Sequence, residues 1–307
     1  MSNPDNNEKT FTQEMQISAQ TGDLALLKSQ ISRWEAEVAD ESIPQKDHLT
    51  FKPTMGEELE SLEMKSRTGK HGAYQNLLNR LLVQAARTNQ VAVIMYILDE
   101  CRGSVTSMAV RRAMAASAFD VLEVFREHGW DVNDPAQENL CPILGFVTNN
   151  ESRVRWCLER GADPNARNKN KYQDIPSQAG RHASVSTLQL LAEHGADFAR
   201  SNALQRAAES NTQGRVEAMQ WLLDSGFPIN QREFEYDPDE FHKWRVHGLG
   251  SALHFAVMAN CPEKVRFLLE READVDLKDT LSKTPREWGH DEGGEEVLAL
   301  LDTWEKQ

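Results

Sequence analysis

The sequence lacks long apolar segments and has few cysteines for its 307 residues. Its longest apolar run, Val91–Leu98, is far shorter than the roughly 20 residues of a transmembrane helix, and the polar N-terminus shows no signal peptide. We therefore expect no membrane association and a cytoplasmic or nuclear location. The cysteines form no CxxC pair and no disulfide framework, so we expect free thiols used as small buried side chains. They are Cys101, Cys141, Cys157 and Cys261.

Positive charge is also scarce. The chain has 34 lysine and arginine residues against 48 aspartate and glutamate residues, which gives a net charge of −14 at pH 7. Such a surface repels phosphate groups, so we expect no nucleic-acid partner, and the net charge favours a basic face on a protein partner. The hydrophobic share of 39% is enough for a buried core. We expect a folded protein that is a monomer by itself.

Motifs for nucleotide binding and nucleophilic catalysis are absent. The strings GxGxxG, GxxxxGK[ST] and GxSxG do not occur. The densest cluster of histidines and carboxylates combines His242 and His247 with Asp239 and Glu240. Its two histidines do not have the i, i+4 helical spacing typical of metal ligands. We therefore expect no catalytic residue, no metal and no cofactor.

A pattern that recurs about every 33 residues dominates the chain. Segments such as Glu159-Arg-Gly-Ala-Asp-Pro-Asn165 share a glycine, and the residues seven and four positions before it are apolar in every repeat. Apolar residues at i and i+3 predict an amphipathic helix, and glycine is favoured where such a helix ends. The glycines are Gly129, Gly161, Gly195 and Gly226, with Cys101 and Glu272 in the same column. The apolar columns are Ile94, Leu122, Val154, Leu188, Met219, Val265 and Val297, and Ile97, Phe125, Cys157, Leu191, Leu222, Leu268 and Leu300.

A second predicted helix, often rich in alanine, precedes each helix that carries the two apolar columns. One helix pair cannot bury its apolar face alone, so neighbouring pairs must stack. Ser251-Ala-Leu-His-Phe-Ala256 resembles the Thr-Pro-Leu-His-x-Ala signature of ankyrin repeats, and Thr284-Pro285 follows after one period. The resemblance covers about residues 74–304. It implies an all-α ankyrin-repeat solenoid of helix pairs joined by β-turn fingers, a structural role for His254, and work as an adaptor, scaffold or regulator.

The predicted organisation has three parts. Residues 1–39 form a helical pair that is a candidate cap, and residues 40–73 form a polar linker or insertion. Residues 74–307 form the array of about six repeats, and Thr284–Trp304 supplies a capping helix pair with acidic residues for its outer face.

Two connections stand out as candidate binding sites. The finger between Gly195 and Ala203 is nearly absent, whereas the one between Gly226 and Ala252 is enlarged, and insertions in repeat proteins often line the binding face. It is interpreted either as an aromatic anchor for a partner or as a loop folded back on its own repeats, with the aromatics in a satellite core. Its candidate contact residues are Phe234, Tyr236, Phe241, Trp244, Arg245 and His247.

The second candidate is the basic turn Arg167–Lys171, with Lys169 at its centre. It is interpreted either as a rim that attracts a carboxylate-rich partner or as an ordinary solvated turn. The array as a whole predicts a protein that binds another protein on its concave and finger face. The alternative hypothesis is an enzyme that uses the concave groove, with His242, His247 and the neighbouring acids as acid–base groups.

Overall fold

The computed structural model describes residues 4–39, 70–136, 139–292 and 294–304. Within these ranges the regular elements are helices, and strand-like pairing is limited to three isolated bridges, so the prediction of an all-α chain is confirmed there. No helix in the described ranges is long and apolar enough to cross a membrane. Most of the expected linker, residues 40–69, lies outside the described residues. The chain divides into two compact units, Met1–Asp131 and Val132–Gln307.

Unit 1 consists of consecutive helix pairs. The first helices of the pairs, α1, α4 and α6, pack against one another in that order, and α5 packs on α7. The helix α4 begins at Lys70, before the expected start of the array at residue 74. The elements are α1 (Pro4–Thr21), α2 (Leu24–Ala39), α4 (Lys70–Arg87), α5 (Val91–Met95), which continues as the π-helical turn η1 (Tyr96–Glu100), α6 (Ser107–Ala116) and α7 (Phe119–Glu127).

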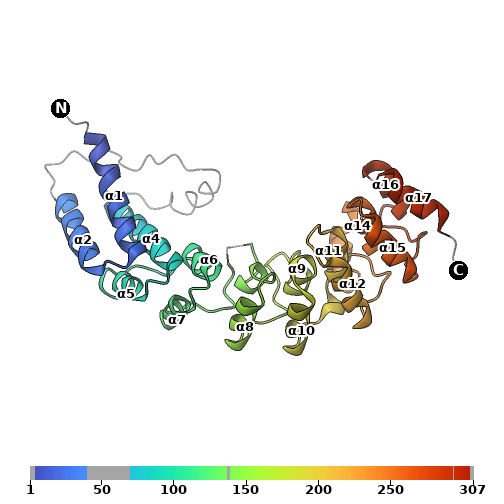
Figure 1. The fold of residues 1–307 in the computed structure, drawn as a ribbon, viewed down its shortest axis with the longest axis horizontal. Coiled ribbons are helices and arrows are strands. Elements are labelled where there is room, and N and C mark those ends of the chain that lie inside the picture. Colours follow the sequence, from blue (N-terminus) through green and yellow to red (C-terminus); the bar gives the residue numbers. More distant parts are fainter. Residues whose placement is uncertain (1–3, 40–69, 137–138, 293, 305–307) are drawn as a thin grey trace. The chain divides into compact units, whose positions relative to one another are not determined.

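Unit 2 stacks its helix pairs in two layers (Figure 1). The first helices α9, α11, α14 and α16 pack in sequence order, and so do the second helices α8, α10, α12, α15 and α17. The first helix of the earliest pair is reduced to a 3₁₀ turn, η2 (Ile143–Phe146). The others are α8 (Glu151–Glu159), α9 (Ile175–His182), α10 (Val185–Glu193), α11 (Ala203–Glu209), α12 (Arg215–Asp224), α14 (Ala252–Met258), α15 (Pro262–Glu270), α16 (Pro285–Glu292) and α17 (Glu295–Thr303).

The two apolar columns form the core of both units. Every member of the columns is 0% exposed except Leu300, which is half-buried near the end of α17. The four glycines of the column and Glu272 take a left-handed conformation, as at Gly195 with φ of +90° and at Glu272 with φ of +64°, whereas after η1 it is Arg102 and not Cys101 that does so. The fingers between pairs are closed at their bases by the isolated bridges Arg167–Asp174 and Arg232–Ser251. The periodic pattern therefore predicted the buried face correctly.

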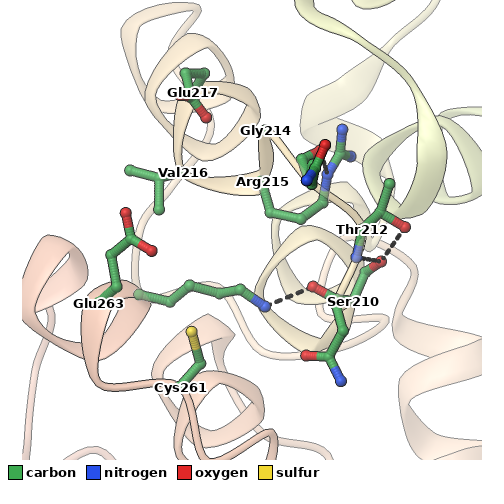
Figure 2. Close-up of a pocket in the computed structure, with 11 residues that line it drawn as sticks. Ser210, Thr212, Gly214, Arg215, Val216, Glu217, Cys261 and Glu263 are labelled. Atoms are coloured by element: carbon green, nitrogen blue, oxygen red, sulfur yellow. Dashed lines mark hydrogen bonds between the residues drawn. The ribbon is translucent and has the colours of Figure 1, made fainter.

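Buried cations join the layers of unit 2. Lys264, in α15, donates hydrogen bonds to Ala208 O at 2.8 Å and Ser210 O at 2.6 Å, at the end of α11. Arg215, at the start of α12, donates to Gly180 O at 2.6 Å and also to Ala183 O, at the end of α9. These helix ends carry unpaired carbonyls that a cation satisfies. Figure 2 shows the pocket that both residues line, and because the carbonyls occupy their charged groups we assign them a structural role.

The helices α9 and α11 approach unusually closely at Gly180. A Cβ atom at this position would overlap the backbone of Ala203, including its carbonyl oxygen. A backbone cannot rotate away as a side chain can, so the contact requires glycine for reasons of space. The glycine therefore sets the distance between two neighbouring first helices.

Gly180→Ala is expected to lower the free energy of unfolding by about 1–3 kcal/mol, because the two backbones must separate. The same substitution at Gly289 in α16 is the control, since a Cβ there meets side-chain atoms of Leu298 and Val257, which can move. Chemical denaturation of the two variants measures the difference. Alanine favours helix over glycine by about 1 kcal/mol, so a Gly180→Ala variant more stable than the wild type would contradict the close approach.

Candidate partner-binding surface

The enlarged loop contains a helix that the sequence analysis did not anticipate. The helix α13 (Pro238–Trp244) and the 3₁₀ turn η4 (Arg245–His247) lie within residues 228–248. Asp237 caps α13 by accepting a hydrogen bond from a backbone N–H of its first turn at 3.3 Å, and Pro238 occupies the first position, where no donor is lost. The dipeptide Asp237-Pro238 is the sequence signal that could have indicated this helix.

Arg167 joins the loop to the basic turn. Its guanidinium donates to Asp237 Oδ2 at 3.0 Å and to Tyr236 Oη at 3.2 Å. Lys243 Nζ donates to Asn170 O at 3.4 Å. The two candidate sites that the sequence placed separately therefore lie side by side. Arg167 and Tyr236 are engaged with each other, so we remove both from the set of partner contacts.

Phe234 lies in the interior beneath the loop. It is 1% exposed, and its ring centre lies 5.8 Å from that of Tyr172 and 6.4 Å from that of Trp244. Its backbone N–H donates to Asn202 Oδ1 at 2.8 Å. A side chain so deeply buried cannot contact a partner, which corrects its assignment as an anchor. For Phe234 the satellite-core interpretation is the right one.

Phe241 also serves the loop's own structure. It is half-buried, and the guanidinium of Arg232 lies over its ring at 5.2 Å from the centre. Arg232 in turn pairs with Glu235 at 2.6 Å. Because a cation held over an aromatic face stabilises the packing of both groups, we assign Phe241 to the loop rather than to a partner contact.

The short finger before the loop leaves room for the loop to fold over. In its place stands a single 3₁₀ turn, η3 (Phe198–Arg200). Gln231 Nε2 donates to Ser201 O at 3.0 Å just beyond this turn, and Gln205 Nε2 donates to Gln231 O at 2.7 Å. The loop thus spans the short connection and reaches the turn at 167–172.

A buried ionic network fixes the base of the loop. Arg206, in α11, donates to Glu233 Oε1 at 2.5 Å and to Glu209 Oε2 at 3.0 Å. Arg181, in α9, donates to the same Glu209 oxygen at 2.6 Å. Burial raises the pKa of Glu233 above its usual range, because the lost hydration outweighs the attraction of Arg206. The pair ties the loop to α11, and each member depends on the other to remain charged in the interior.

Several side chains of the loop and of the neighbouring finger tips remain exposed. Tyr172 is 44% exposed, Val246 67% and Leu281 53%. The half-buried Trp244 lies beside Tyr172, with 5.1 Å between the ring centres, and Leu281 lies against Gly248, two residues after Val246. Sequence analysis missed Tyr172, Val246 and Leu281. We name the tip surface as Lys169, Lys171, Tyr172, Lys243, Trp244, Arg245, Val246, His247 and Leu281.

The histidines of the alternative enzyme hypothesis are exposed at this surface. His242 projects from α13, and His247 lies beside Trp244 with a distance of 5.6 Å between ring centres. The pocket of Figure 2 lies elsewhere, between the segment that joins α11 to α12 and the start of α15. Within the described residues no group of three or more His, Cys, Asp or Glu side chains is arranged to hold a metal ion. This geometry gives the enzyme hypothesis no support.

Stacked helix pairs with projecting fingers define a helical repeat protein. The ankyrin repeat family model matches residues 251–280, which contain α14 and α15. The match supports an ankyrin-repeat protein, with one repeat detected, and agrees with the resemblance carried by Ser251–Ala256. A comparison with curated proteins finds no match. Ankyrin repeats are in general protein-interaction modules, and they are typically not catalytic.

Proposed function

We propose that this chain binds another protein, and that the tip surface is the contact region on an ankyrin solenoid. An adaptor, a scaffold and a regulator all work through such a contact. The observation that carries the proposal is the set of exposed apolar side chains Tyr172, Val246 and Leu281 on neighbouring finger tips, with the half-buried Trp244 beside Tyr172. Contiguous exposed apolar groups rimmed by charge are characteristic of protein interfaces.

The base of the loop supports this proposal as well. Phe234 is packed inside, and Arg206 and Glu233 tie the loop to α11. A loop that is held in one conformation before binding loses less conformational entropy when a partner arrives. The buried Phe234 thereby holds the loop in the conformation that exposes the tip surface. The satellite-core interpretation applies to Phe234, and the partner-contact interpretation applies to the exposed residues.

The double variant Tyr172→Ala/Val246→Ala is expected to weaken binding of the partner at least about 10-fold, because truncating central apolar contacts costs about 2 kcal/mol or more. Affinity purification with quantitative mass spectrometry identifies the candidate partners, and titration calorimetry with the purified partner then measures the affinity. Phe146→Ala is the matched control, since Phe146 is 45% exposed in the same unit but lies on η2, outside the tip surface. Equal recovery of every partner by the double variant and the wild type would exclude the tip surface as the contact region.

A further inference from the structure

The charges left exposed on the tip surface are mostly of one sign. Lys169, Lys171 and Arg245 are exposed, and none of the three enters an ion pair within the part of the chain that the structure describes. Lys243 is half exposed and pairs with Glu240 at 3.3 Å. This basic group stands out on a chain whose net charge is −14. The local charge is therefore opposite to the expectation from the net charge.

Most acids near the tip surface are already neutralised by partners within the chain. Asp237 pairs with Arg167 at 3.0 Å and is 17% exposed. Glu240 is 8% exposed and accepts from Trp244 Nε1 at 2.8 Å, in addition to its contact with Lys243. Asp239 is the exposed acid of α13 outside these pairs. The internal pairing thus leaves the tip surface with excess positive charge.

Apolar and basic side chains lie next to each other on two fingers, and the next finger adds one apolar side chain. Tyr172 follows Lys171 on one tip, Val246 follows Arg245 on the enlarged loop, and Leu281 projects from the next finger. The loop and the next finger are joined because Thr280 Oγ1 donates to Arg245 O at 2.6 Å. An extended chain crossing these tips would meet both apolar and positive side chains.

We propose that the tip surface binds an acidic, extended segment of a partner protein. The apolar side chains of the segment contact Tyr172, Val246 and Leu281, while its carboxylates contact Lys169, Lys171 and Arg245. This inference rests on the proposed function and adds the chemistry of the partner. Charge complementarity of this kind speeds association and selects against basic segments.

A protein segment fits this surface better than a nucleic acid does. Tyr172 is the most exposed aromatic side chain of the tip surface, and the more exposed Val246 and Leu281 are aliphatic and provide no face on which a second base stacks. The rest of the chain, with its excess of 48 acidic over 34 basic residues, repels a phosphate backbone that extends past the tips. A short run of carboxylates with apolar neighbours can contact Lys169, Lys171 and Arg245 without extending over the acidic remainder of the chain, so it avoids this repulsion.

The test selects binders to the full chain from a displayed library of random peptides. Enriched peptides are expected to be acidic and to carry apolar residues, and fluorescence anisotropy with a labelled selected peptide measures the affinity. The triple variant Lys169→Glu/Lys171→Glu/Arg245→Glu is expected to lose at least about 10-fold in affinity, and raising the salt from about 50 to about 300 mM is expected to weaken wild-type binding. Arg266→Glu is the matched control, because Arg266 is exposed on α15 outside the tip surface.

Each other outcome overturns the inference. A selection that yields no peptide, or only neutral or basic ones, contradicts it, and so does unchanged affinity in the triple variant. Tighter binding of a single-stranded oligonucleotide of about 20 nucleotides, lost in the triple variant, would identify a nucleic acid as the ligand. If non-acidic peptides still lose affinity in Tyr172→Ala/Val246→Ala, the partner chemistry is wrong while the proposed function stands. If neither peptides nor proteins depend on Tyr172 and Val246, the proposed function itself fails.

Discussion

Replacing Arg206 by alanine is expected to lower the free energy of unfolding by about 3–5 kcal/mol, because it leaves a charge buried without its partner. The group left without its partner is the carboxylate of Glu233, whose side chain is 9% exposed and accepts a hydrogen bond from Arg206 at 2.5 Å. Arg181 remains with Glu209, so the loss falls on the base of the enlarged loop. Chemical denaturation measures the stability, and hydrogen exchange across residues 231–251 shows whether the loop has detached from α11.

Two comparisons make the Arg206 result specific. Arg232→Ala breaks the ion pair with Glu235, whose side chains are 29% and 38% exposed, and is expected to cost no more than about 1 kcal/mol. The double variant Arg206→Met/Glu233→Gln removes both charges and is expected to recover most of the loss. Equal losses of unfolding free energy in Arg206→Ala and Arg232→Ala would show that the buried Arg206–Glu233 pair matters no more for stability than an exposed pair. A detached loop should also weaken partner binding, although no residue of the tip surface has changed.

Acidification is expected to destabilise the protein through His254. This residue is 0% exposed, accepts from Ser251 N–H through Nδ1 at 3.1 Å and donates from Nε2 to Lys283 O at 3.1 Å. Burial lowers the pKa of His254 to about 4, against about 6.5 for an exposed histidine. Because the unfolded chain takes up the proton first as the pH falls, the contribution is complete above about pH 6.5. It is lost progressively down to about pH 4 and amounts to about 3 kcal/mol.

Carboxylates take up protons over a similar pH range, so the effect of His254 is isolated by comparing the pH dependence of the unfolding free energy in the wild type and in a His254 variant. His254→Gln keeps an acceptor for Ser251 N–H, as in a capping box, but has no proton to gain. The difference in unfolding free energy between wild type and His254→Gln is expected to shrink as the pH falls from about 7 to about 4. His194→Gln, at the exposed end of α10, is the control and should follow the wild type. Parallel pH profiles for wild type and His254→Gln would contradict the buried neutral imidazole.

The periodic part of the fold was predictable because its causes are local. Apolar residues at i and i+3 define one helical face whatever the helix later packs against, and the glycine column marks where the second helix of a pair ends. Pro262 begins α15 and Pro285 begins α16, positions where proline loses no hydrogen bond. The turn between α1 and α2 likewise falls at Gly22 and Asp23, within the predicted helical pair of residues 1–39.

The candidate site was predictable only in outline. The sequence located the enlarged loop and the basic turn, because an interruption of a period is visible without a structure. It did not show that the two lie together, since the contact of Arg167 with Asp237 spans 70 residues and that of Lys243 with Asn170 spans 73. Tyr172, the residue that follows the basic turn, was overlooked because a single aromatic in a turn carries no periodic signal.

The sequence by itself determined the helix pairs, their buried columns and their ends, since spacing and capping act within a few residues of each other. Only the tertiary structure decided which aromatics of the loop are interior and which are exposed. Phe234 and Trp244 are both aromatic, and their different exposure follows from the shortened finger before the loop and from the charge pair that ties the loop to α11. Contacts between distant segments of an aperiodic loop leave no pattern in the sequence, so the proposed binding surface is a product of folding.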